Sequence, residues 1–139
     1  MSGKNQYPVT FNWQSTNPFT GFLPNPNPGG SLPSGVVNGA MASTNTIYSQ
    51  IIDISRMDNV GLEVNWTGTP TGTLQVMGSN SGINAYALTF TPPLGQPAGS
   101  AGGYLIDLTQ YPFKYIMLEY TNSSGSGTLT VYGQNKDLN

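Results

Sequence analysis

An internal repeat is the feature that most restricts how this chain of 139 residues can fold. The phrase GTLQVMGSN at residues 72–80 returns as GTLTVYGQN at residues 127–135. Ahead of it, residues 51–67 align without a gap on residues 105–121, and the second copy has one additional residue in the turn that follows. Side-chain alternation is kept along with the identities. We therefore expect two similar units that pack against each other.

Each copy is predicted to form a strand, a connection, a second strand, a hairpin turn and a third strand. Leu62, Val64 and Trp66 alternate with polar residues, as in a strand with one buried face. The turn sequences TGTPTG and TNSSGSG are rich in the residues that close β-hairpins. With the alternating run NAYALTF between the copies, the pattern gives about seven strands in residues 45–136.

The fold class that follows is all-β: a β-sandwich built from two similar β-units that face each other about an approximate twofold axis. Helical periodicity is absent, and 18 glycines with 11 prolines disfavour long helices. Alternation assigns faces but not strand order, so a jelly roll and a simpler sandwich both remain open. The predicted sandwich domain spans residues 46–139 and contains the repeat copies, residues 51–80 and 105–135.

Residues 1–45 differ in composition and are predicted to form an extended N-terminal arm. Six of the 11 prolines lie there, and PNPNPGG suits neither a helix nor a central strand. The run YPVTFNW alternates and could supply one strand. Either the arm completes or covers the domain's own sheet, or it leaves the domain and docks aromatic side chains on a neighbouring subunit. The candidates for such contacts are Tyr7, Phe11, Trp13, Phe19 and Phe22, with Phe11 and Trp13 as the preferred anchors.

The composition excludes several kinds of chemistry. Without cysteine or histidine there is no thiolate nucleophile, no disulfide, no Ser-His pair and no zinc site of the usual type. Four basic and six acidic residues give a net charge of -2, with no basic stripe for nucleic acid. No apolar run is long enough to span a membrane, and MSGKNQYPVTFNW does not have the pattern of a signal peptide. We expect no cofactor, no nucleic-acid partner and no membrane span.

Carboxylates are the remaining candidates for catalysis or metal binding. Asp53 and Asp107 are equivalent in the repeat, but neither has the neighbouring oxygen ligands of a calcium loop, so we interpret them as exposed or turn-forming. Glu63 and Glu119 could serve as the acid and base of a glycosidase, but alternation places them on outward faces of separate strands. We therefore predict no catalytic residue, no metal ligand and no enzymatic activity.

The aromatic residues support a second interpretation, in which the domain binds a carbohydrate or a receptor. Trp66 and Tyr120 share the alternation of the apolar residues and are expected in the core. Tyrosine rings elsewhere could stack on sugar rings, with Asn, Asp and Gln nearby. The tyrosines outside the core pattern are Tyr86, Tyr104, Tyr111 and Tyr132. Such a module would bind through the sandwich and tolerate the loss of the arm.

The strings WTGTPTGTLQVMGSNSG and YTNSSGSGTLTVYGQN resemble a motif of small β-sandwich proteins from bacteriophage virions, and the resemblance covers residues 47–136. The shared pattern is an aromatic residue, a Thr/Gly turn, Gly-Thr-Leu, an alternating strand and Gly-Ser-Asn. The acidic residue that follows in those proteins is replaced by Ser81 here. The resemblance implies a structural role, as a minor capsid, decoration or spike-base protein, and it carries over no catalytic residue.

The low content of charged residues agrees with that role. Only 7% of the residues are charged, against about 25% in typical soluble domains. Such a surface can pack against neighbours without desolvating many ions. We predict a non-enzymatic virion protein, made in the host cytoplasm, that forms a homo-oligomer and contacts other virion proteins through the sandwich and the arm. The alternative is a carbohydrate- or receptor-binding β-sandwich module.

Overall fold

The structure is a computed structural model, and it describes residues 5–11, 13–14, 36–37, 39–54, 59–91, 93–108 and 112–137. These residues form twelve strands, and all the pairings between them are antiparallel. Within the described ranges, no helix is long and apolar enough to cross a membrane.

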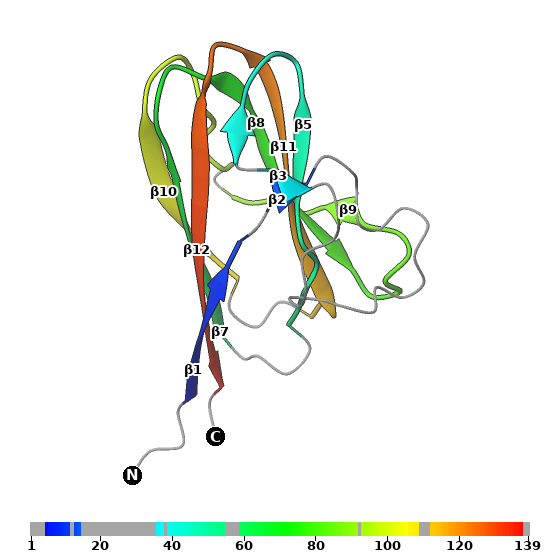
Figure 1. The fold of residues 1–139 in the computed structure, drawn as a ribbon. Helices are drawn as coiled ribbons and strands as arrows, with labels where there is room; N and C mark the ends of the chain where they lie inside the picture. The colour runs from blue at the N-terminus through cyan, green and yellow to red at the C-terminus, as the bar shows by residue number, and fades with distance from the viewer. Residues whose placement is uncertain are drawn as a thin grey trace.

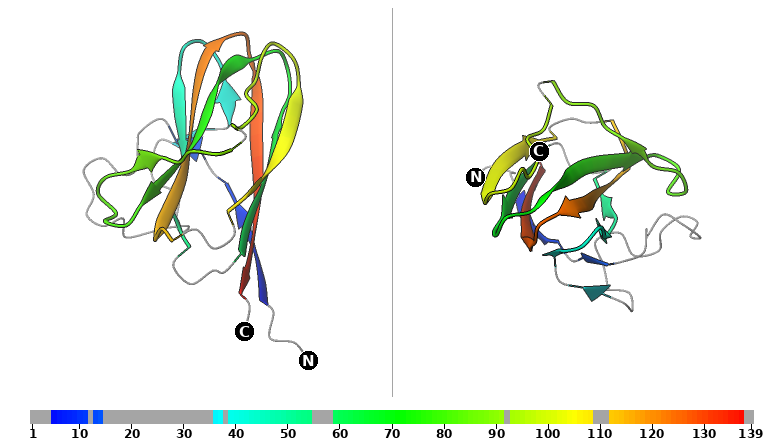
Figure 2. Two further views of the ribbon diagram at one scale, coloured as in Figure 1. Left: turned by 180° about the vertical axis from the view of Figure 1, so that it is seen from behind. Right: turned by 90° about the horizontal axis from the view of Figure 1, so that it is seen from above.

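The strands form two sheets that face each other (Figures 1 and 2), so the predicted all-β sandwich is confirmed. The five-stranded sheet contains, in order, β1 (Asn5–Thr10), β12 (Gly127–Asp137), β7 (Asn59–Trp66) and β10 (Gly102–Asp107), with β4 (Ala40–Met41) also paired to β12. The seven-stranded sheet contains, in order, β3 (Val36–Val37), β2 (Trp13–Gln14), β5 (Thr46–Ser49), β11 (Tyr115–Ser124), β8 (Thr71–Ser79) and β9 (Tyr86–Ala87), with β6 (Ile52–Asp53) paired to β11.

The core lies between the sheets and is built from every second side chain of the long strands. Leu62, Val64 and Trp66 of β7 are all buried, as their alternation predicted. Two large polar aromatics of the core have hydrogen-bond partners: Trp66 Nε1 donates to the carbonyl oxygen of Ser100 at 2.8 Å, and the Tyr120 hydroxyl donates to Asn122 Oδ1 at 2.8 Å. The core position predicted for Trp66 and Tyr120 is confirmed.

The two copies of the repeat are interleaved. The first copy contributes β7 to the five-stranded sheet and β6 and β8 to the other, whereas the second copy contributes β10 and β12 to the five-stranded sheet and β11 to the other. Strand β7 pairs with β12, and β11 pairs with β8, which is the same pairing with the copies exchanged. In the same way, the pairing of β10 with β7 corresponds to that of β6 with β11.

The register of these pairs is also the same in both halves. Trp66 faces Leu129 in one pair, and their repeat equivalents Tyr120 and Leu74 face each other in the other pair. An approximate twofold relation between the copies requires this equality, so the hydrogen-bonding pattern supports the predicted twofold arrangement. Two further equivalent bonds run from Leu108 N to Val60 O at 2.8 Å and from Ile54 N to Lys114 O at 2.9 Å.

The turns inside the copies are not hairpins, and that prediction was wrong. TGTPTG joins β7 to β8 and crosses from one sheet to the other, and TNSSGSG does the same between β11 and β12. The two crossing turns contact each other, with Thr69 N donating to Ser126 O at 2.9 Å. Gly68 and Gly125, at φ of 79° and 69°, supply the left-handed backbone that either kind of reversal can use. Turn composition therefore could not distinguish the two.

The outer edge of β8 is covered by the chain that follows it. Of the run NAYALTF, which was expected to alternate as a strand, only Tyr86–Ala87 forms one, and it pairs with β8. Further along, the Gln96 side chain bonds both peptide groups of Leu74: Oε1 accepts from its N–H at 2.5 Å, and Nε2 donates to its carbonyl oxygen at 3.0 Å. The amide thus provides hydrogen bonds to backbone groups of β8 that another strand would otherwise have to provide.

The equivalent edge of β12 is covered by the N-terminal residues. Strand β1 pairs with β12 along its length, β4 pairs with the start of β12, and Leu129 N donates to Gly39 O at 2.6 Å. Figure 1 shows β1 and β12 side by side, with the start of β1 and the end of β12 at the same end of the sheet. The described part of the arm therefore completes the domain's own sheets, the first of the two interpretations, and it forms four short strands rather than one.

Two equivalent glycines, Gly72 and Gly127, lie where the backbone leaves no room for a side chain. A Cβ at Gly127 would overlap the carbonyl oxygen of Thr67, and a Cβ at Gly72 would overlap that of Thr121, the repeat equivalent of Thr67. We expect Gly72→Ala and Gly127→Ala each to lower the free energy of unfolding by about 1–3 kcal/mol, measured by urea denaturation, because the backbone must shift. Gly61→Ala is the control, because a Cβ there meets no atom within 4 Å, and it should change stability by less than about 0.5 kcal/mol. An equal loss in all three variants would contradict the account.

Candidate functional site

The described acidic residues do not gather into a metal-binding cluster, and the two carboxylate pairs considered in the sequence are separated. Glu63 projects from β7 and Glu119 from β11, each on the outward face of a different sheet. Asp53 and Asp107 end the equivalent strands β6 and β10, and both are exposed. Over the described ranges, no three His, Cys, Asp or Glu side chains come close enough together to hold a metal ion. The carboxyl pairs singled out in the sequence are therefore kept apart by the sandwich.

The structure places two of the five aromatic arm candidates in the chain's own core. Phe11 and Trp13 are 8% and 4% exposed and belong to the cluster between the sheets. Their alternation reflects a segment that passes from β1 in one sheet to β2 in the other, and both side chains pack inside their own chain. Tyr7 lies in β1, which belongs to the five-stranded sheet. Phe19 and Phe22 fall outside the described residues.

The tyrosines considered for a binding surface differ in exposure. Tyr86 and Tyr132 are 72% and 58% exposed. Tyr104 is partly buried, and its ring meets that of Trp66 edge to face, with the centroids 5.8 Å apart and the planes at 71°. Burial raises the pKa of Tyr104 to about 12. Tyr111 lies outside the described residues, so Tyr86 and Tyr132 are the two described candidates with readily accessible rings.

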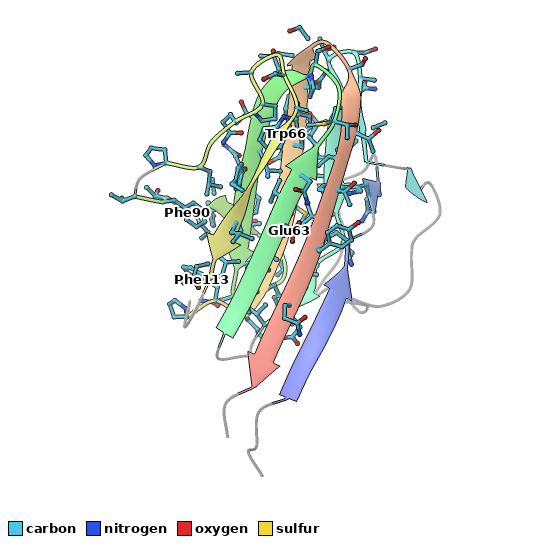
Figure 3. All side chains as sticks on the ribbon, turned by 90° about the vertical axis from the view of Figure 1, so that its left-hand side faces the viewer. Glu63, Trp66, Phe90 and Phe113 are labelled. Carbon is cyan, nitrogen blue, oxygen red and sulfur yellow. The ribbon has the colours of Figure 1, made fainter. Side chains whose placement is uncertain are left out.

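The outer face of the five-stranded sheet has an open groove of about 610 Å³ that crosses β10, β7 and β12. In its central row, Glu63 of β7 is flanked by Leu105 of β10 and Tyr132 of β12. Figure 3 looks onto this face and shows Glu63 on β7, between β10 and β12. The next row consists of Asp107, Gly61 and Gln134.

Both polar and apolar groups have defined places in the groove. Asn65 Nδ2 donates to Glu63 Oε2 at 2.9 Å, which orients the carboxylate. Leu105 is 78% exposed, and Tyr132 is the other large apolar side chain beside the carboxylate. Because Gly61 has no side chain and a Cβ there would touch nothing within 4 Å, it leaves a hollow in the middle of the second row.

The equivalent face of the seven-stranded sheet is closed by apolar side chains. The repeat equivalents of Leu105 and Glu63 are Ile51 and Met117, which are 0% and 1% exposed. They form a second apolar cluster with Tyr115, the equivalent of Gly61. Partly buried residues that pack against this cluster are Tyr48, Met77 and Ala85. The same positions of the repeat thus make a sealed layer on one sheet and an open groove of mixed polarity on the other.

Sequence reasoning named Tyr132 and Glu63 separately but missed the groove that brings them together. Leu105 and Gln134 were not considered, because alternation does not reveal which residues face each other across strands. One signal was present in the repeat. Its alignment sets Glu63 against Met117, a change from apolar to acidic at an outward position.

Comparison with solved structures relates this architecture to known proteins. The chain is similar to the SPBc2 prophage-derived protein YomS, with a TM-score of 0.51 and 10% identity, over 99% of this chain and 97% of that chain. The two proteins share a fold. At this identity the likeness shows the architecture alone.

Two further similarities have lower scores. They are to a chain of infectious bursal disease virus Gx strain (TM-score 0.49, 13% identity, 99% of this chain and 33% of that chain) and to the enzymatically active domain of bacteriophage CBA120 tailspike protein 4 (TM-score 0.45, 14% identity, 99% and 20%). No protein-family model matches the sequence, and no curated protein matches it.

Because of Tyr104, the free energy of unfolding is expected to depend on pH in the alkaline range. Its hydroxyl is buried with no hydrogen-bond partner among the described residues, and its pKa rises from 10.0 in the unfolded chain to about 12 in the folded protein. The stability contributed by the protonated hydroxyl is therefore complete below pH 10 and declines as the pH rises towards about 12. We expect Tyr104→Phe to reduce the loss of unfolding free energy over this interval and to be neutral or stabilising at pH 7.

Urea denaturation at neutral and alkaline pH measures this effect, with Tyr132→Phe as the matched control at an exposed tyrosine. The control should leave both the neutral stability and the alkaline decline unchanged. A loss of more than about 1 kcal/mol in Tyr104→Phe at pH 7 would mean that the hydroxyl makes a stabilising hydrogen bond, and would contradict the account.

Proposed function

We propose that this protein is a non-enzymatic structural protein of a bacteriophage virion, of the minor capsid, decoration or spike-base type. The sandwich would serve as a rigid body, and residues 15–35 would contact neighbouring subunits. Two observations support this role. The fold extends over nearly the whole length of a prophage-derived protein, and only 7% of the residues carry charge, which favours close packing between subunits.

The observation that carries the proposal is the place of residues 15–35 in the sequence, between two strands that pair with each other. Strands β2 and β3 are antiparallel partners, with Gln14 opposite Val36. Strands in this register need only a two-residue turn, yet the chain inserts the whole of residues 15–35 between them. Strand β3 is the edge strand of the seven-stranded sheet. Long insertions of this kind usually serve function rather than stability.

The composition of the insertion suits a binding segment. Phe19 and Phe22 are side chains of the type that anchors protein interfaces. The prolines of PNPNPGG restrict the free chain, so less conformational entropy is lost when the segment binds. With Phe11 and Trp13 in the core, Phe19 and Phe22 become the arm aromatics proposed to contact neighbours.

The register of β2 and β3 allows the insertion to be removed without disturbing the sandwich. Replacing residues 15–35 by Asn-Gly joins Gln14 to Val36 through a tight turn and retains the buried Trp13. Light scattering on a sizing column should show a defined oligomer for the full chain and a folded monomer for the shortened chain. Phe19→Ala/Phe22→Ala keeps the chain length and should also dissociate the oligomer. The same number of subunits in all three proteins would contradict assembly through this segment.

The non-enzymatic part of the proposal has its own test, because Glu63 and Glu119 are the carboxylates first considered for hydrolysis. Incubation with polysaccharide substrates should give no release of reducing ends above that of a buffer blank. A hydrolytic activity that disappears in Glu63→Gln or Glu119→Gln would overturn this part of the proposal and leave the assembly test unaffected.

A further inference from the structure

We propose that the groove on the outer face of the five-stranded sheet binds a neutral oligosaccharide of hexopyranose units. The ring of Tyr132 would stack on one face of a sugar, while Glu63 and Gln134 would bond its hydroxyls. The site lies on β7, β10 and β12, away from the strands that flank residues 15–35. It therefore does not depend on the assembly role.

The groove has the size and character of a small-molecule site. Its volume of about 610 Å³ falls within the usual range for ligand pockets, about 300–1,000 Å³. Leu105 and Tyr132 are exposed apolar side chains on this face. At the equivalent positions of the other sheet, the apolar side chains are covered by the chain's own residues. The open face is thus a departure from the symmetry that governs the rest of the repeat.

Four neighbouring positions on this face form the proposed sugar site. Tyr132 and Glu63 face each other in one row, and Gln134 and Gly61 face each other in the next. Adjacent strands are about 4.8 Å apart, and successive residues on one face of a strand are about 7 Å apart, so the three side chains surround an area comparable with one sugar ring. The fourth position, Gly61, is the hollow, and it provides space for the ring itself.

The chemistry of these groups matches the two kinds of surface on a pyranose. Its C–H face is apolar and stacks on an aromatic ring, as Tyr132 provides. Its rim carries hydroxyls that both donate and accept. Glu63 is held in place by Asn65, and a carboxylate with about four acceptor positions can accept further hydroxyl donors. The Gln134 amide supplies both donors and an acceptor on the adjacent row.

Other partners fit these residues less well. An apolar protein surface would bury the Glu63 carboxylate between Leu105 and Tyr132 and add no hydrogen-bond donor to the one from Asn65, which is costly for a charged group. An anionic ligand would be repelled by Glu63 and Asp107, since no basic residue is among those that line the groove. A neutral ligand rich in hydroxyls satisfies the carboxylate and covers the tyrosine ring at the same time.

The test uses the full chain labelled with ¹⁵N and four probes: maltotriose, cellotriose, tri-N-acetylchitotriose and, as a cationic comparison, chitotriose. We expect at least one of the three neutral probes to shift amide resonances in β7, β10 and β12 with saturable binding. Tyr132→Ala should weaken that binding about tenfold, whereas Tyr132→Phe, which keeps the ring, should retain most of it. Glu63→Gln should weaken it as well, because a charged acceptor is replaced by a neutral amide.

Tyr86→Ala is the matched control, because Tyr86 is at least as exposed as Tyr132 but lies on the other sheet. It should leave the affinity unchanged, and the spectra will show that each variant is folded. The proposal is overturned if no neutral probe binds, if the shifts lie elsewhere, if Tyr86→Ala weakens binding as much as Tyr132→Ala, or if only the cationic probe binds. It is also overturned if Leu105→Asp dissociates an oligomer, because this face would then be a protein interface.

Discussion

The antiparallel pairing of β7 with β12, repeated as that of β11 with β8, is the interaction on which the rest of the structure depends. Each pair joins one strand from each copy of the repeat, so neither sheet consists of a single copy. A copy on its own would leave its strands without hydrogen-bonded neighbours from the repeat, because β7 pairs with β10 and β12, and β6 and β8 pair with β11. At the start of β8 and of β12, Gly72 and Gly127 each lie so close to a backbone carbonyl oxygen that no side chain would fit. The repeat in the sequence therefore reflects two interleaved units that form one core.

Much of this fold follows from the sequence because alternation directly reports which side of a strand is buried. The buried Leu62, Val64 and Trp66 were predictable in this way, as was the all-β class. The interleaving was not, because a turn such as TGTPTG can reverse the chain within a sheet or carry it to the other sheet. The groove was hidden for a related reason: Glu63, Leu105 and Tyr132 come from three strands, and only the register brings them into one row. The role of the described arm strands depended on an open edge of β12, which no local pattern reveals.

The symmetry of the repeat separates structural features from candidates for function. The registers of the equivalent strand pairs are the same in both halves. One departure from this symmetry is the open groove around Glu63, whose counterpart around Met117 is sealed. The sequence insertion of residues 15–35 between β2 and β3 lies outside the repeat altogether. The proposals for assembly and for saccharide binding each rest on one of these two features, so either can fail without the other. Both are compatible with a rigid sandwich that presents two separate surfaces.

Disulfide trapping tests the interleaved pairing most directly, because the chain has no cysteine of its own. Opposite residues of antiparallel strands are about 4.5–5.5 Å apart at Cα, which a disulfide can bridge. Asn65 faces Thr130, and their repeat equivalents Glu119 and Gln75 also face each other. Cysteine pairs at 65/130 and at 75/119 should both close on mild oxidation, as measured by peptide mass, and a pair at 65/75 should stay reduced because those residues lie on different sheets. Closure of 65/75 with failure of the other two would mean that β7 and β8 form a hairpin, and would contradict the interleaved structure.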